Sequence, residues 1–140
     1  MIDIPAAAKV NTEDGAVAFV RFWFEQVNVA FTRPNPDLIP TLSASSCKSC
    51  ASLAEHPVGF AAKGYRVQPA PFRPLTNVKS LGLSTDGTRI AFTLSQGDAD
   101  VVDRSGKVVD TQKADSVERV ALVARKGNQW LMAGLASPTS

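Results

Sequence analysis

A chain of 140 residues with 44% hydrophobic and 20% charged residues is long enough for one packed domain and too apolar to be disordered. Its net charge of +2, from 15 basic and 13 acidic residues, is too small for the basic footprint of a nucleic-acid-binding protein. No apolar run reaches the roughly 18 residues of a membrane-spanning helix, and the first ten residues lack the pattern of a signal peptide. We therefore expect a soluble or mature globular form.

The N-terminal part predicts a short lead-in and then a long helix. Residues 1–11 read as flexible and unstructured, whereas residues 12–32 follow the period of an amphipathic helix that Thr12 can cap. Its apolar stripe is Ala16, Val20, Trp23, Val27 and Ala30. Four phenylalanines widen this stripe, namely Phe19, Phe22, Phe24 and Phe31. We therefore expect a curved sheet on one side of this helix and other helices on another.

Two further helical pieces are predicted before the strands begin. Asn35 can cap a short second helix with Pro36 at its first position, and a third helical piece can start at Cys47. From Tyr65 onward, the sequence pattern predicts strands. Prolines interrupt residues 65–72, which is typical of an edge strand.

The rest of the chain reads as an antiparallel meander. Asp86-Gly87 predicts a hairpin with a primed turn, and residues 98–110 predict a small protruding hairpin. Two long strands joined at residues 126–128 should be central in the sheet. Helices followed by antiparallel strands predict an α+β fold, with one domain over residues 12–136 and a tail over residues 137–140.

Charge is segregated along the sequence. Residues 61–93 carry five basic side chains against Asp86, whereas residues 94–118 carry six acidic side chains against three basic ones. Two readings stay open. The segments attract each other or are simply solvated, or they form a patch that binds a partner.

The only two cysteines, Cys47 and Cys50, are separated by a lysine and a serine. A zinc site needs four ligands, and His56 is the one histidine that could join them. A thioredoxin-like redox pair would follow a strand, whereas this pair follows a helix and an Ala-Ser loop. We predict a structural disulfide that pins two helix ends and contributes about 2 kcal/mol, with free thiols, redox exchange and metal binding as alternatives. A disulfide would place the protein in an oxidising compartment.

His56 precedes a proline in a predicted loop, where a surface or capping role is the usual one. A catalytic arrangement of His56 with Tyr65 at the mouth of the fold is the alternative. Four aromatic residues can form either core or the lining of a ligand pocket, and they are the candidate ligand-binding residues: Phe19, Trp23, Phe92 and Trp130. No metal, cofactor or phosphate-binding loop is predicted.

The order of "EDGAVAFVRFWFEQVNVAF", "LIPTLSASSCKSC" and "VERVALVARKGNQWLMAGL" resembles an actinobacterial family of uncharacterised exported lipoproteins. The matching positions are Trp23, Cys47, Cys50, Gly106 and Trp130. The resemblance covers about residues 12–136 and implies a cone-shaped, nuclear-transport-factor-2-like fold, in which a long helix and short helices pack on a curved antiparallel sheet. It also implies a cell-envelope location, with membrane attachment only through a lipid on an upstream cysteine.

The strand residues expected inside the cone include no acid and no histidine, which argues against catalysis. We therefore predict a non-catalytic extracytoplasmic module that binds an envelope protein or an apolar, lipid-like ligand. The alternatives are a small enzyme of isomerase or dehydratase type, and thiol-disulfide exchange at Cys47 and Cys50.

Overall fold

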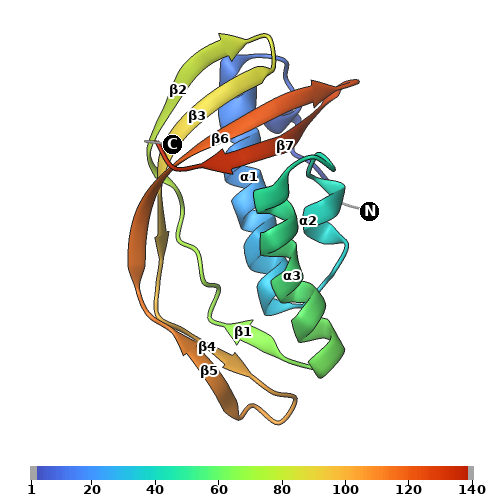
Figure 1. Ribbon diagram of the computed structural model, residues 1–140, viewed down its shortest axis with the longest axis vertical. Helices are drawn as coiled ribbons and strands as arrows, with labels where there is room; N and C mark the ends of the chain where they lie inside the picture. Colours follow the sequence, from blue (N-terminus) through green and yellow to red (C-terminus); the bar gives the residue numbers. More distant parts are fainter. Residues whose placement is uncertain (1–2, 139–140) are drawn as a thin grey trace.

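The computed structural model describes residues 3–138, so the first two residues of the predicted lead-in and the last two of the predicted tail lie outside it. The chain forms its helices first and its strands afterwards (Figure 1). The helices are η1 (Ala6–Ala8), α1 (Glu13–Thr32), α2 (Leu38–Thr41) and α3 (Lys48–Lys63). The strands are β1 (Arg66–Gln68), β2 (Thr76–Ser84), β3 (Gly87–Gln96), β4 (Ala99–Val102), β5 (Val108–Gln112), β6 (Asp115–Lys126) and β7 (Gln129–Ala136).

The helix α1 confirms the long helix predicted over residues 12–32. The Thr12 hydroxyl accepts a hydrogen bond from the Gly15 N–H at 3.0 Å, and two acidic residues occupy the first turn, where the helix dipole favours them. Ten residues of α1 are buried, including all four phenylalanines. The helix therefore packs on more than one side, as the width of its apolar stripe predicts.

The strands form two antiparallel sheets, one with the order β2-β3-β6-β7 and one with the order β1-β4-β5. The prediction that both C-terminal strands are central is wrong for β7, which is an edge strand. Residues 42–44 cover part of that edge, since Met132 exchanges backbone hydrogen bonds with Leu42 and Ala44 at 3.0 and 2.8 Å. The predicted edge position of β1 is confirmed.

The hairpin of β2 and β3 is confirmed, but its turn is not the predicted primed turn. Ser84 pairs with Gly87, and among residues 3–138 the only residue other than glycine with positive φ is Asn77, so Thr85 and Asp86 turn with negative φ. The Asp86 carboxylate instead bonds the Ser84 hydroxyl at 2.5 Å. Gly87 has φ 136° and its missing Cβ would strike the Val123 carbonyl. Any side chain at this position would collide with β6, so the glycine allows β3 to approach β6 this closely.

The predicted lead-in is packed rather than unstructured over its described part. It contains η1, where Ala8 is 2% exposed, and it supplies acceptors to the sheet. The Trp130 indole N–H donates to the Val10 carbonyl at 2.9 Å, and the Arg125 guanidinium donates to the Lys9 carbonyl at 2.7 Å. A buried indole needs an acceptor, and sequence periodicity gives no sign of which backbone carbonyl provides it.

The helices that follow α1 differ from the prediction in their bounds. The second helix is short, as predicted, but it begins at Leu38, and the Asn35 side chain accepts a hydrogen bond from the Asp37 N–H at 3.0 Å instead of capping the helix. The third helix is longer than expected, because α3 continues through Pro57 and ends at Gly64, which has φ 75°. His56 therefore lies in a helix and not in the predicted loop. Within residues 3–138, no helix combines the length and apolar character needed to cross a bilayer.

The core lies between α1 and the four-stranded sheet. Trp23 and Trp130 are each 1% exposed, and the Trp23 indole N–H donates to the Ser43 hydroxyl at 3.2 Å. Phe24 joins the helix to the sheet through edge-on ring contacts, with centroid distances of 4.9 Å to Trp23 and 5.4 Å to Phe92. Both tryptophans therefore combine apolar burial with a satisfied N–H group.

Candidate functional site

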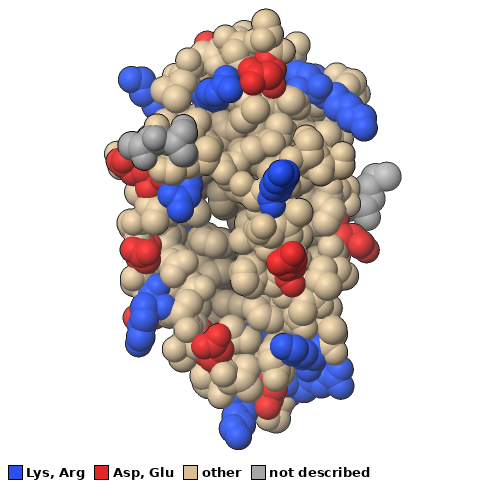
Figure 2. Space-filling view, in the orientation of Figure 1, with Lys and Arg blue, Asp and Glu red and all other residues tan. Residues whose placement is uncertain are grey.

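A cleft of about 420 Å³ separates α3 from the hairpin of β4 and β5, and we call it the α3–hairpin cleft. In the orientation of Figure 1, the space-filling view shows this face hollowed between its helical and strand sides, with acidic and basic groups interspersed around it (Figure 2). The cleft is lined by Glu55, His56, Gly59, Phe60, Lys63, Tyr65, Val101, Val109 and Asp110.

One wall of the cleft is a single face of α3. Its residues recur at the three- and four-residue spacing of one helix side. The His56 and Phe60 rings both contact Phe31 of α1, with centroid distances of 5.8 and 5.9 Å. A Cβ added at Gly59 would meet no atom within 4 Å, so this glycine leaves the space in front of the rings open.

The other wall is the inner face of the three-stranded sheet. Strand register places Val67 of β1 opposite Val101 of β4, and Val101 opposite Asp110 of β5. Cross-strand partners share a face, so these three side chains form one row across the sheet. The row begins with buried Val67 and ends with exposed Asp110.

The turn between β4 and β5 is held by one carboxylate. Asp103 Oδ1 accepts hydrogen bonds from the Ser105 N–H at 2.9 Å, the Ser105 hydroxyl at 2.6 Å and the Lys107 N–H at 3.0 Å. The Ser105 hydroxyl, followed by the Lys107 N–H, holds the pKa of Asp103 below its ordinary value. Gly106 supplies the positive φ of 89° in this turn.

The cleft brings together His56 and Tyr65, as the alternative catalytic arrangement requires, and adds the carboxylates of Glu55 and Asp110. Within residues 3–138, however, no hydrogen bond joins the imidazole or the phenol to either carboxylate. Lys63 Nζ lies 5.8 Å from the centre of the Tyr65 ring. Acid-base groups therefore share one surface without forming an assembled proton-transfer pair.

The four predicted ligand-binding residues lie outside this cleft. Phe19, Trp23 and Phe92 are 0, 1 and 3% exposed and pack in the core. Trp130 borders a separate groove of about 330 Å³ between the β2–β3 turn and the β6–β7 hairpin. The aromatic stripe in the sequence therefore marks core, and the ligand role of these residues stays a prediction. Sequence reasoning missed Gly59 and Phe60, because Pro57 predicts a loop there, and it missed Val109, because no local pattern places β5 opposite α3.

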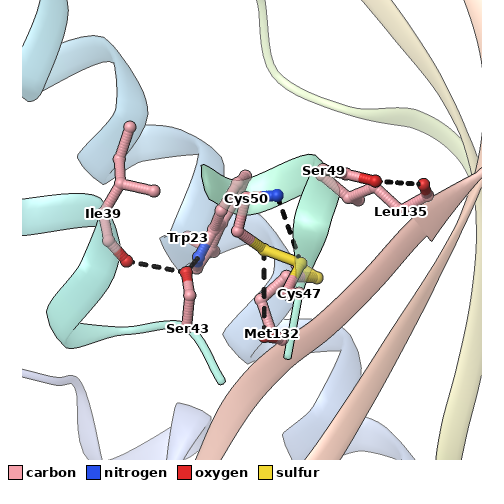
Figure 3. The surroundings of a disulfide bond; sticks show 8 residues. All are labelled: Trp23, Ile39, Ser43, Cys47, Ser49, Cys50, Met132 and Leu135. Carbon is pink, nitrogen blue, oxygen red and sulfur yellow. Dashed lines mark hydrogen bonds between the residues drawn. A yellow bond between two sulfur atoms is a disulfide. The ribbon is translucent and has the colours of Figure 1, made fainter. Parts of the chain in front are cut away.

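The predicted disulfide is present, with Cys47 and Cys50 joined at the start of α3 (Figure 3). Cys47 caps the helix, and its sulfur accepts a hydrogen bond from the Cys50 N–H at 3.2 Å. The same turn contacts β7, where the Cys50 sulfur lies 3.8 Å from the Met132 carbonyl and the Ser49 hydroxyl donates to the Leu135 carbonyl at 2.9 Å. The bridge therefore closes the first turn of α3, and the hydrogen bond of Ser49 joins this turn to the sheet edge.

Two details of the disulfide prediction need correction. The bridge does not pin two helix ends, because both cysteines belong to the first turn of α3 and α2 ends earlier, at Thr41. The pair also occupies a helix start, as redox-active pairs do. Both cysteines are only 2% exposed, which limits access to a second thiol.

Solved structures share this architecture at low sequence identity. The chain is similar to the intermembrane-space region of the chloroplast protein ARC6, with a TM-score of 0.62, 14% identity, and coverage of 91% of this chain and 96% of that chain. It is also similar to a putative calcium/calmodulin-dependent protein kinase II association domain from Xanthomonas campestris, with a TM-score of 0.51, 15% identity, and coverage of 99% and 97%. These likenesses confirm the predicted α+β, nuclear-transport-factor-2-like fold.

Comparison with curated proteins gives no match. Residues 3–136 match the family described as "Family of unknown function (DUF6318)", a span that includes the packed lead-in as well as the helices and both sheets. The chain therefore belongs to this family.

Proposed function

We propose that this protein is a non-catalytic module of the cell envelope that binds a partner protein in the α3–hairpin cleft. The observation that carries the proposal is the cleft itself, which combines about 420 Å³ of open volume with exposed apolar side chains at its borders. Val109 in the cleft is 42% exposed, and its strand neighbour Val108 is 47% exposed. Exposed apolar groups beside a concave surface are typical of a binding site.

An extracytoplasmic location is part of the proposal. The Cys47–Cys50 disulfide supports it, because disulfides persist in oxidising compartments and are rare in the cytosol. The resemblance to actinobacterial exported lipoproteins also supports it, and adds attachment through a lipid upstream of this chain. The association domain among the similar structures is consistent with a role of this fold in protein assembly, although that likeness carries no partner over to this chain.

The experiment uses a photo-crosslinking amino acid, benzoylphenylalanine, in place of Val109, in the full-length protein expressed in its source cells. We expect a discrete crosslinked product that disappears when Gly59→Trp fills the cleft. Ala62→Trp is the matched control, because Ala62 is an exposed residue of the same helix outside the cleft lining. Absence of a product, or a product that Gly59→Trp leaves unchanged, would contradict binding in the cleft.

An enzyme of isomerase or dehydratase type is the second candidate, favoured by the presence of His56, Tyr65 and two carboxylates in one cleft. Under the binding proposal, His56→Ala and Tyr65→Phe keep most of the crosslinked product, since the aromatic wall still includes Phe60. Accumulation of a small-molecule substrate in cells carrying both substitutions would favour the enzyme instead.

A further inference from the structure

The strand β5 has a free edge beside the cleft. The sheet order β1-β4-β5 leaves β5 paired on one side only within residues 3–138. Val108, Val109, Asp110 and Thr111 are all exposed. The Thr111 N–H donates to the Asp110 carboxylate of its own strand at 2.9 Å, so a side chain and not a second strand serves as its acceptor. An exposed edge strand that is paired on one side only is a template for another strand.

The side chains beside this edge indicate which kind of residue an added strand would place next to them. The row of Val67, Val101 and Asp110 runs across the sheet and ends at Asp110. The next position in the row would lie beside Asp110 at the mouth of the cleft, which Glu55 also lines. The only ion pair among residues 3–138 is Asp86–Arg89, so Glu55 and Asp110 lack cationic partners.

A second copy of this chain fits this edge poorly. If two β5 strands paired over their full length about a twofold axis, the middle residue of this five-residue strand, Asp110, would face its own copy. Like charges directly opposite each other destabilise a strand pair. A basic residue at that position would instead form a favourable cross-strand pair.

We propose that β5 binds an extended segment of a partner protein by strand addition, with a lysine or arginine facing Asp110 and apolar residues two positions before and after it, on the same face. This inference rests on the proposed function, because it specifies how a partner would enter the α3–hairpin cleft. The aliphatic part of the basic side chain lies along the cleft, and its charge meets Asp110 and Glu55. The added strand extends the sheet to four strands.

The test is a titration of the ¹⁵N-labelled protein with a capped peptide of sequence Thr-Val-Thr-Lys-Thr-Val-Thr, followed by NMR. We expect the amide shifts to concentrate on Val109, Asp110 and Thr111. Replacing the peptide lysine with glutamate should weaken binding about tenfold, since an attractive cross-strand pair becomes a repulsive one. A peptide with N-methyl groups on its alternate amides should also bind about tenfold more weakly, because it loses backbone donors.

Asp110→Lys should reverse the preference, so that the glutamate peptide binds more tightly than the lysine peptide. Asp115→Lys is the matched control, because Asp115 is exposed and accepts from the next N–H at 2.9 Å in the same manner, but lies in β6. Its preference should stay that of the unmodified protein.

Strand addition is overturned if the lysine peptide does not bind, if N-methylation leaves its affinity unchanged, or if Asp110→Lys leaves the preference unchanged. In each case a crosslinked product at Val109 that Gly59→Trp removes would still support the cleft as the binding site. The two proposals therefore fail separately.

Discussion

The two sheets of this protein differ in how far the residues of their inner faces are buried. In the four-stranded sheet, the inner residues Ile90, Val123 and Met132 are fully buried beneath α1. In the three-stranded sheet, the inner row reaches exposed Asp110, and Val108 and Val109 are 47% and 42% exposed. The inner face of the first sheet therefore supplies stability, whereas the inner row of the second sheet opens into the α3–hairpin cleft at the β5 edge, as a binding surface does.

The largest effect should come from the core between α1 and the four-stranded sheet. Trp23→Ala or Trp130→Ala should lower the free energy of unfolding by about 3–5 kcal/mol, because each removes a fully buried aromatic side chain. Phe60→Ala, in the half-buried wall of the cleft, should lower it clearly less. Urea unfolding followed by tryptophan fluorescence or circular dichroism measures all three, and equal losses would remove the contrast between the regions.

Asn28 should have the next effect, because it joins α1 to the segment between β1 and β2. Its side-chain amide donates to the Phe72 carbonyl at 2.8 Å and accepts from the Phe72 N–H at 2.9 Å. Asn28→Ala leaves both backbone groups without these partners and should cost about 2 kcal/mol in denaturant unfolding. Asn35→Ala is the control, since it loses one exposed hydrogen bond. An equal loss of unfolding free energy in both variants would show that the paired hydrogen bonds of Asn28 with Phe72 add no stability.

Removing the disulfide should cost about 2 kcal/mol or slightly less, because the closed loop is short. The double substitution Cys47→Ser and Cys50→Ser should lower the melting temperature, and a reductant should then have no further effect. A reductant added to the unmodified protein should produce a similar shift. Two fast-reacting thiols in the untreated, native protein would contradict the structural role and weaken the extracytoplasmic location.

The smallest effect concerns the turn beside the cleft and depends on pH. The pKa of Asp103 lies below its ordinary value in the folded protein, so its carboxylate stabilises the fold above that ordinary value. The contribution is lost as the pH falls through the lowered pKa. Asp103→Asn should therefore reduce protection of the Ser105 and Lys107 amides from hydrogen exchange at neutral pH, and the difference should vanish in acid. A difference that is independent of pH would show that the charge has no part in holding the turn.

The sequence predicts the stable region better than the cleft, for physical reasons. The α1 helix has a strong 3.6-residue period and a capping Thr12, so its bounds follow directly. The α3 helix contains Pro57, and local rules indicate a break there although tertiary packing keeps the helix continuous. His56 and Phe60 were consequently not recognised as one helix face. The cleft also depends on the placement of Val109 and Asp110 opposite α3, a long-range contact that no local pattern encodes.

The most direct test of the division between the regions compares two sets of exposed apolar residues. Benzoylphenylalanine is placed, one site at a time, at Val108 and Val109 of β5, beside the cleft, and at Leu81 and Leu83 of β2, which are 52% and 69% exposed. Crosslinking is carried out in the source cells on the full-length protein. The account predicts the same partner product from Val108 and Val109 and none from the β2 positions, whereas a product from Leu81 or Leu83 alone would place the binding surface on the four-stranded sheet.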